Sequence, residues 1–197
     1  DGDDLWIGTY TGGVNVLNTK TGVFRVYTTK AGDPTTLDRS SSYAIFKDRE
    51  ARIWVTSMSG VNLYNREEDN FTRIRDLGSW IMDIDQDADG NIWFSSQGNG
   101  LFKYDPDKQE WTNYVHSSAP GALINDQVNC VLIDGNGEMW IGTMNGLCKY
   151  NGVWWYIKNG SVSFTNTLCK YNGTWWYINN GVVNFNKTTL CKYNGSW

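Results

Sequence analysis

The chain has 197 residues, of which 40% are hydrophobic and 15% aromatic, a composition that excludes a disordered protein. Its net charge of −4 combines 13 basic and 21 acidic residues in positions 1–150 with four Lys and no acid in positions 151–197. An acidic first part without basic runs argues against nucleic-acid binding, and no apolar run reaches the roughly 18 residues that a membrane span needs.

One short segment recurs four times and organises the first 150 residues. In each copy a Trp is followed by one hydrophobic residue and two small or hydroxyl residues, then by Gly and an apolar-polar alternation. The four Trp are Trp6, Trp54, Trp93 and Trp140, separated by 48, 39 and 47 residues. A period in this range with strand-like alternation is typical of four-stranded propeller blades. The sequence therefore predicts an all-β fold with about four blade units.

The number of expected strands differs between the four units. Residues 5–27 provide three strands and lack an innermost one, whereas residues 41–76 and 80–116 each provide four. The fourth unit starts at residue 128, and residues 153–157 are a candidate for its outermost strand. A first unit that lacks one strand fits a propeller closed by a strand from the far end of the chain, because closure removes an exposed edge.

Two segments carry a resemblance to a known family: GNIWFSSQGNGLFKYDPDKQEWTNY from Gly90 and NCVLIDGNGEMWIGTMNGLCKYN from Asn129. They closely resemble the two-component-regulator propeller repeats of the periplasmic sensor halves of bacterial hybrid histidine kinases. The resemblance covers residues 1–150 and implies seven-bladed propellers, commonly two in tandem, that sense extracellular ligands, often oligosaccharides. This chain departs from the family because it has about four units, no kinase and no membrane span. A fragment, further blades and self-association all remain open.

The tail, residues 151–197, follows a shorter period. The hexapeptide LCKYNG begins at Leu147, Leu168 and Leu190, and its Asn-Gly pair is a strong type I′ hairpin signal. The pattern predicts serial aromatic β-hairpins stacked in a solenoid. Because LCKYN at the join fits either repeat, the tail could instead supply outer strands of the last blade.

The tail loosely resembles the aromatic cell-wall-binding and glucan-binding repeats of Gram-positive surface proteins. Those repeats hold choline or sugar in aromatic sockets between hairpins. The residues that the resemblance assigns to such sockets are Trp154, Trp155, Trp175, Trp176 and Tyr177. Adjacent strand residues point to opposite faces, so one Trp of each pair should be exposed.

One acidic turn is a candidate calcium site. Asp85, Asp87 and Asp89 precede Gly90 and match the first half of a D-x-D-x-D-G calcium loop. The twelfth position is Ser96 rather than Glu, so the usual bidentate ligand is absent. Acidic turns before the Trp strand recur in the other units, which favours a plain hairpin turn. No other cofactor is expected.

The chain offers few groups for catalysis. His116 is the single His, and no GxSxG motif is present. The four Cys residues form no CxxC pair, so we expect buried small side chains rather than zinc ligands or disulfides. We therefore predict a protein that is not an enzyme.

Ligand contacts in propellers normally come from loops at the ends of the central channel. The recurring Trp residues should therefore pack between blades rather than form a sugar platform. The candidate ligand-binding residues lie in the linkers just before the innermost strands: Arg39, Ser41, Tyr43, Ser79, Trp80, Asn125 and Gln127.

The leading hypothesis is a non-catalytic recognition module that acts outside the cytoplasm, in the periplasm, at the cell surface or extracellularly. Its expected partner is an oligosaccharide or a cell-wall polymer, with the tail as the surface attachment. One alternative is a structural repeat segment of a surface or filament protein. A second alternative is a propeller lyase or another carbohydrate-active enzyme.

Overall fold

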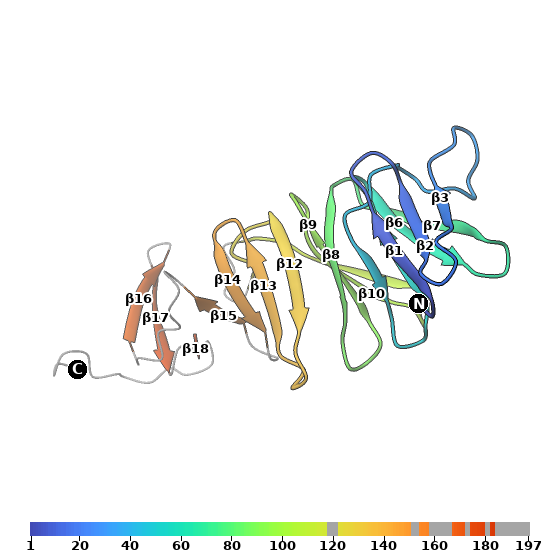
Figure 1. The fold of residues 1–197 in the computed structure, drawn as a ribbon. Helices are drawn as coiled ribbons and strands as arrows, with labels where there is room; N and C mark the ends of the chain where they lie inside the picture. Colours follow the sequence, from blue (N-terminus) through green and yellow to red (C-terminus); the bar gives the residue numbers. More distant parts are fainter. Residues whose placement is uncertain (118–121, 151–153, 158–166, 172–173, 180–181, 184–197) are drawn as a thin grey trace.

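The computed structural model describes residues 1–117, 122–150, 154–157, 167–171, 174–179 and 182–183 (Figure 1). These residues form β-strands joined by turns and loops, and none of them lies in a helix. No helix that could span a membrane is found in this part of the chain. The predicted all-β class is confirmed.

The strands form five antiparallel sheets, of which the first four are called blades 1 to 4. Blade 1 contains β1 (Asp4–Gly8), β2 (Val14–Asn18) and β3 (Phe24–Tyr27). Blade 2 contains β4 (Ile45–Lys47), β5 (Ile53–Thr56), β6 (Gly60–Asn65) and β7 (Asn70–Asp76). Blade 3 contains β8 (Ile81–Gln86), β9 (Ile92–Ser96), β10 (Gly100–Asp105) and β11 (Glu110–Tyr114). Blade 4 contains β12 (Val128–Ile133), β13 (Met139–Thr143), β14 (Gly146–Tyr150) and β15 (Trp154–Ile157). The fifth sheet contains β16 (Thr167–Tyr171), β17 (Thr174–Asn179) and β18 (Val182–Val183).

Within each blade the strands pair in chain order, so each blade is a meander of consecutive hairpins. Blade 1 has three strands, as the sequence predicts. Blade 4 takes β15 as its outermost strand, with Tyr150 opposite Trp154. The sheet therefore extends past residue 150, where the composition changes. The Asn-Gly pairs predicted to turn the tail hairpins lie outside the described residues.

Strand β4 is shorter than expected, and the residues before it bond both to blade 1 and to Thr56 of β5. Ser42 N–H donates to Thr9 O of blade 1 at 2.9 Å, and Ala44 N–H donates to the Thr56 hydroxyl at 3.0 Å. This linker therefore joins two blades before the strand begins.

The recurring Trp residues pack between blades, as predicted. Trp54 is buried in a cluster with Ile84, Phe94 and Phe102 of blade 3. Trp93 occupies the same place against blade 4, and Trp6 packs against blade 2. We call this side of each blade its Trp face. Complete burial of an aliphatic or aromatic side chain contributes about 1.5–3 kcal/mol, so these contacts are a main source of stability between blades.

In blades 2 to 4 the indole N–H of the recurring Trp has a polar partner inside the same blade. Trp54 Nε1 donates to Asp48 at 2.7 Å, and Trp93 Nε1 donates to Asp87 at 2.8 Å. In blade 4 the corresponding distance to Asp134 is 3.5 Å. Each Asp lies six residues before its Trp, in the turn after the innermost strand. The buried Nε1 of Trp6 has no partner among the described residues.

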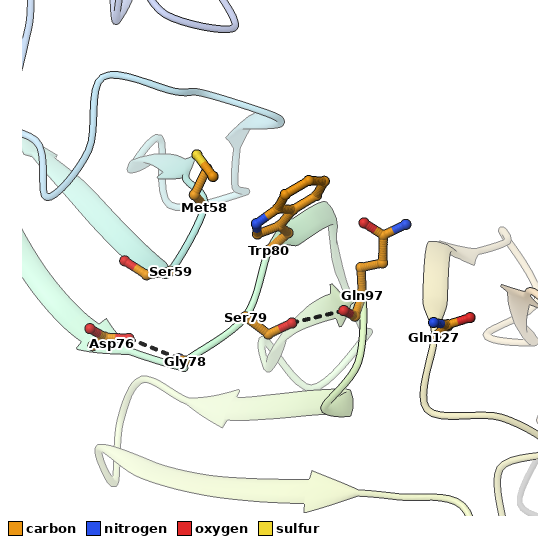
Figure 2. Close-up of a pocket in the computed structure, with 8 residues that line it drawn as sticks. All are labelled: Met58, Ser59, Asp76, Gly78, Ser79, Trp80, Gln97 and Gln127. Carbon is orange, nitrogen blue, oxygen red and sulfur yellow. Dashed lines mark hydrogen bonds between the residues drawn. The ribbon is translucent and has the colours of Figure 1, made fainter.

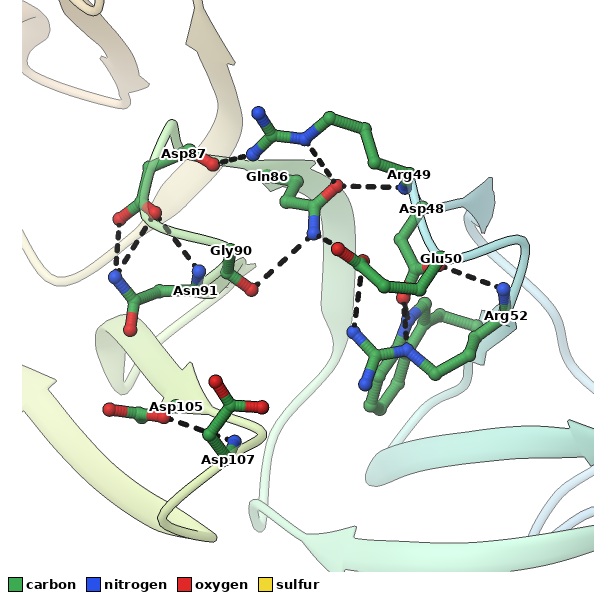
Figure 3. Close-up of polar contacts among 11 residues, drawn as sticks. Asp48, Arg49, Glu50, Arg52, Gln86, Asp87, Gly90, Asn91, Asp105 and Asp107 are labelled. Atoms are coloured by element: carbon green, nitrogen blue, oxygen red, sulfur yellow. Dashed lines mark hydrogen bonds and ion pairs between the residues drawn. The ribbon is translucent and has the colours of Figure 1, made fainter.

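Polar contacts also join the turns of neighbouring blades (Figure 3). The backbone N–H and the Nε of Arg49 both donate to Gln86 Oε1, at 2.9 and 3.0 Å. Gln86 Nε2 donates in turn to Glu50 Oε2 at 2.9 Å. Because Arg49 and Glu50 belong to the blade 2 turn and Gln86 ends β8, this network fixes the two turns relative to each other.

Two carboxylates of β8 join the innermost strands of blades 3 and 4. Asp83 accepts the N–H of Val131 at 3.1 Å, and Asp85 accepts the N–H of Ile133 at 2.6 Å. Burial raises the pKa of Asp83, an effect that the Val131 and Ile84 N–H groups partly offset and the Asp85 charge reinforces. These side chains thus satisfy backbone groups that would otherwise lack partners along the sheet edge.

We predict that Asp87→Ala lowers the free energy of unfolding by about 2–4 kcal/mol, because it removes the acceptor of Trp93 and of several turn donors. Those donors are the N–H groups of Asp89 and Asn91 and the side-chain amide of Asn91. Denaturant unfolding monitored by Trp fluorescence measures the change. The matched control is Asp89→Ala, an exposed residue of the same turn, which should change stability by less than about 0.5 kcal/mol. Equal effects of the two substitutions would contradict the prediction.

We predict that Asp83→Asn alters the pH dependence of stability. The folded-state pKa of Asp83 lies above its unfolded value of about 3.9. Ionisation of this carboxyl therefore disfavours the folded state, and its contribution to stability falls as pH rises through the raised pKa. Unfolding curves of the wild type and of Asp83→Asn at stepped pH from about 3.5 upward should show this loss in the wild type alone, because the amide does not ionise. If the free energies of unfolding of the two proteins change with pH in the same way, the raised pKa of Asp83 in the folded state is wrong.

Candidate ligand-binding site

Loops from successive blades meet at one end of the sheets and present a row of aromatic side chains. We call Tyr10, Tyr43 and Trp80 the aromatic row. The rings of Tyr43 and Trp80 stack with centroids 5.9 Å apart and planes 17° apart. Tyr10 meets Tyr43 edge to face at 6.3 Å. The side chain of Trp80 is 40% exposed and Tyr10 is largely exposed, so the row combines internal stacking with accessible aromatic surface.

A cavity of about 530 Å³ lies beside Trp80 (Figure 2). Its lining comes from the ends of three blades: Met58, Ser59, Asp76, Gly78, Ser79, Trp80, Gln97 and Gln127. Its volume falls within the range of small-molecule sites in proteins, and it is a shallow pocket open to solvent rather than an enclosed one. The cavity and the aromatic row together form the candidate site.

A buried polar network fixes the linker that carries Tyr43. Asp38 accepts hydrogen bonds from Asn62 Nδ2 at 2.6 Å, from Ser57 Oγ at 2.6 Å and from Ser59 Oγ at 3.0 Å. The Asp38 N–H donates to Asn62 Oδ1 at 3.0 Å. Because three side chains of blade 2 bind one carboxylate, the start of the linker is held against that blade.

The loop that carries Trp80 is fixed by its backbone. Leu77 N–H and Gly78 N–H both donate to Ser59 O, and Gly78 adopts a positive φ of 68° that favours glycine. The Ser79 hydroxyl donates to Gln97 O at 3.0 Å, and Gln97 N–H donates to Trp80 O at 2.9 Å. The indole is therefore presented by a constrained loop, which limits the entropy lost on ligand binding.

The polar groups at the site are mainly uncharged, and several have no hydrogen-bond partner among the described residues, so they can bind a ligand. The side-chain amides of Gln97 and Gln127 have no hydrogen-bond partner among the described residues, and Figure 2 shows both beside the cavity. The Tyr43 hydroxyl is buried without a partner, and burial raises its pKa, so it stays protonated at neutral pH. Asp76 is the one ionisable lining residue, and its carboxylate accepts the Gly78 N–H at 2.8 Å. Such a site can stack an apolar ring face and hydrogen-bond hydroxyl groups.

The structure brings some of the predicted ligand-binding residues together. Tyr43 and Trp80 stack, and Gln127 lines the same cavity. Arg39 does not line it; its side chain is exposed and donates to Asp38 O at 3.2 Å. Asn125 lies outside the lining as well and accepts the Gln127 N–H at 2.7 Å.

The sequence analysis missed the residues four positions after each recurring Trp. Tyr10, Met58 and Gln97 occupy this position in blades 1, 2 and 3 and belong to the candidate site. The sequence did contain a signal for them. The residue type at this position differs from unit to unit, whereas the strand before it has nearly the same sequence in every unit.

The candidate calcium ligands are not gathered in one place. The Asp85 carboxylate binds the Ile133 N–H of blade 4, whereas the Asp87 carboxylate caps its own turn and Trp93. Asp89 is exposed. Within the described part of the chain no group of three His, Cys, Asp or Glu side chains is placed to hold a metal ion.

The other reactive side chains lie apart from the cavity lining. His116 is exposed, with Nδ1 at 2.7 Å from Leu123 O and its backbone N–H bonded to Asp126. Cys148 is buried, as expected, and burial raises the pKa of its thiol, but Cys130 is exposed, which differs from the expectation of burial. Cys130 faces outward because its strand neighbour Val131 takes the buried position.

The aromatic candidates of the tail lie on strands. Trp154 and Trp155 belong to β15, and Trp175, Trp176 and Tyr177 belong to β17, where Cys169 of β16 is opposite Trp176. The orientation of their side chains lies outside what the structure describes, so the prediction that one Trp of each pair is exposed stays a prediction.

Comparison with known sequences confirms both resemblances. Residues 122–145 match the two component regulator propeller family. Residues 143–163, 164–184 and 186–197 match the choline-binding repeat. A curated relative, histidine kinase P4 of Formosa agariphila, is 30% identical over 157 residues, an alignment that covers 75% of this chain and 11% of that protein. The chain thus spans about a tenth of this relative.

Solved structures show the same fold. The extracellular domain of a putative hybrid two component system from B. thetaiotaomicron aligns with a TM-score of 0.67 and 21% identity, over 99% of this chain and 28% of that one. Virginiamycin B lyase from Staphylococcus aureus aligns with a TM-score of 0.61 and 13% identity, over 88% of this chain and 59% of the lyase. At these identities the similarity establishes the fold alone, so the propeller-type blades predicted from the sequence are confirmed.

Proposed function

We propose that the chain is a non-catalytic recognition module that acts outside the cytoplasm and binds a glycan-like ligand at the aromatic row and its cavity. The observation that carries this proposal is the exposed face of Trp80 beside the unpaired amides of Gln97 and Gln127. An indole stacks on the apolar face of a pyranose ring, and amides hydrogen-bond its hydroxyl groups. The extracellular domain of a putative hybrid two component system has the same fold, which supports the proposed location and a sensing role.

The enzyme hypothesis has less support in the described residues. The single His is exposed, and its Nδ1 lies at hydrogen-bond distance from a backbone carbonyl. General acid-base catalysis needs such a group within reach of a bound substrate, and His116 does not line the cavity. Glycan turnover that is lost in His116→Ala would overturn the non-catalytic assignment.

The tail is proposed to attach the module to choline or to a cell-wall polymer. The support is the match of three consecutive segments to the choline-binding repeat, together with the doubled Trp in the first two of them. Aromatic side chains bind quaternary ammonium groups through cation–π attraction. The propeller part would then read a soluble ligand while the tail holds the chain at a surface.

We predict that Trp80→Ala weakens glycan binding by about tenfold or more, because removal of the stacking surface of a central aromatic costs at least about 1.4 kcal/mol. A glycan array identifies a saccharide that binds, and titration calorimetry then compares the variants. The matched control is Met144→Ala, an exposed residue at the corresponding strand end of blade 4 that does not line the cavity. If no saccharide binds, or if Trp80→Ala binds like the wild type, the proposed site is wrong and a structural role gains support.

We predict that either Trp175→Ala or Trp176→Ala reduces retention on immobilised choline or wall polymer, because adjacent strand residues expose one indole of the pair. Column retention of each variant measures the effect. Trp80→Ala should be retained like the wild type, since it alters the propeller part alone. Unchanged retention of both tail variants would contradict the attachment role without affecting the glycan site.

A further inference from the structure

The cavity beside Trp80 contains a carboxylate and no basic group among its described lining residues. Asp76 is the one ionisable residue of the lining. One oxygen of its carboxylate accepts the Gly78 N–H at 2.8 Å, a bond that Figure 2 shows at the end of β7. The other oxygen has no hydrogen-bond partner in the part of the chain that the structure describes. The cavity therefore offers a ligand one negatively charged acceptor that the protein does not use.

The basic residues closest to Asp76 in sequence are engaged elsewhere. Arg73 Nε donates to Thr36 O at 2.9 Å. The guanidinium carbon of Arg75 lies 5.2 Å from the ring centroid of Trp111 in blade 3. Neither Arg73 nor Arg75 lines the cavity. The two basic side chains of β7 thus leave the Asp76 carboxylate without a paired cation at the cavity.

A second carboxylate lies directly behind the lining. Ser59 lines the cavity, and its hydroxyl donates to Asp38 Oδ2 at 3.0 Å. The other side chains that donate to Asp38 are those of Ser57 and Asn62, which are also neutral. Arg39 is exposed and donates to the backbone carbonyl of Asp38 rather than to its carboxylate. Because charges near a protein surface interact more strongly than in bulk water, Asp38 adds to the negative potential at the cavity.

We propose that the glycan site selects sugars that carry a free ammonium group and that Asp76 is its specificity-determining residue, an inference that rests on the proposed function. The ammonium of an amino sugar donates to the unused Asp76 oxygen in a charge-assisted hydrogen bond, which an N-acetylated sugar cannot form. A uronic acid would bring a second negative charge to a cavity without a basic lining residue, and like charges repel.

Asp76 lies beside the groups already assigned to sugar binding. Figure 2 shows Asp76 and Gln127 on opposite sides of Trp80. A ligand that spans the cavity can stack on the indole, hydrogen-bond the amides of Gln97 and Gln127, and reach the carboxylate. An ammonium group near an indole gains cation–π attraction as well. A quaternary ammonium group has no N–H to donate to the carboxylate, which favours an amino sugar as the ligand.

The test compares three oligosaccharides of equal length by titration calorimetry with the full 197-residue chain, under mildly acidic conditions that keep the sugar amine protonated. They are an oligomer of glucosamine, its N-acetylated counterpart and an oligogalacturonate. The glucosamine oligomer should bind at least about tenfold more tightly than the N-acetylated one, and the oligogalacturonate should bind most weakly. Asp76→Asn should reduce this preference to about twofold or less, because the amide oxygen still accepts the Gly78 N–H but carries no charge.

Two further variants exclude binding through the overall acidity of the chain. Asp89→Asn is the matched control, because it removes an exposed carboxylate that does not line the cavity, and it should keep the full preference. Trp80→Ala should weaken the binding of the glucosamine oligomer and of the N-acetylated oligomer alike. Circular dichroism checks that each variant keeps its β-structure.

The outcomes separate this inference from the proposed function. If the glucosamine and N-acetylated oligomers bind equally, or if Asp76→Asn keeps the preference, Asp76 does not determine specificity and the glycan site still stands. If none of the three oligosaccharides binds, the selection of amino sugars is wrong. The proposed function is wrong as well only if the glycan array also shows no ligand.

Discussion

The structure depends on an indole that meets two demands at once in blades 2 and 3. Its ring must be buried against the next blade, and its N–H must be bonded, because a buried donor without a partner costs about 1–3 kcal/mol. Asp48 and Asp87 supply the acceptor from the turn six residues earlier. One residue type therefore links the hairpin turn inside a blade to the packing between blades, which explains why turn and strand recur together in the sequence.

Because this requirement fixes the strand and its turn, the other end of the strand is free to vary. The positions that follow it carry Tyr10, Met58 and Gln97 in successive blades, and these meet the linkers that carry Tyr43 and Trp80. The repeated strands and turns thus carry a candidate site whose residues differ from blade to blade. The loops have little freedom of their own, since Asp38 and several backbone bonds join them to the blades.

The number of blades, their strand order and the packing of the Trp residues could be predicted from periodicity, because each depends on local alternation that repeats. That Tyr43, Trp80 and Gln127 lie close together could be predicted, because all three stand before innermost strands. The position of Arg39 and Asn125 away from the cavity could not, since it depends on which way each side chain leaves a loop. The exposure of Cys130 likewise depends on the register between β12 and β13, which shifts beside it. No local pattern encodes that shift.

The candidate site draws residues from all four blades: Tyr10 from blade 1, Met58 from blade 2, Gln97 from blade 3 and Gln127 from the linker into blade 4. Its geometry is therefore set by the interfaces between blades rather than by any single sheet. Close-packed interfaces transmit small shifts instead of absorbing them. Blades contact mainly their neighbours, so the position of each site residue depends on the interfaces on either side of its blade.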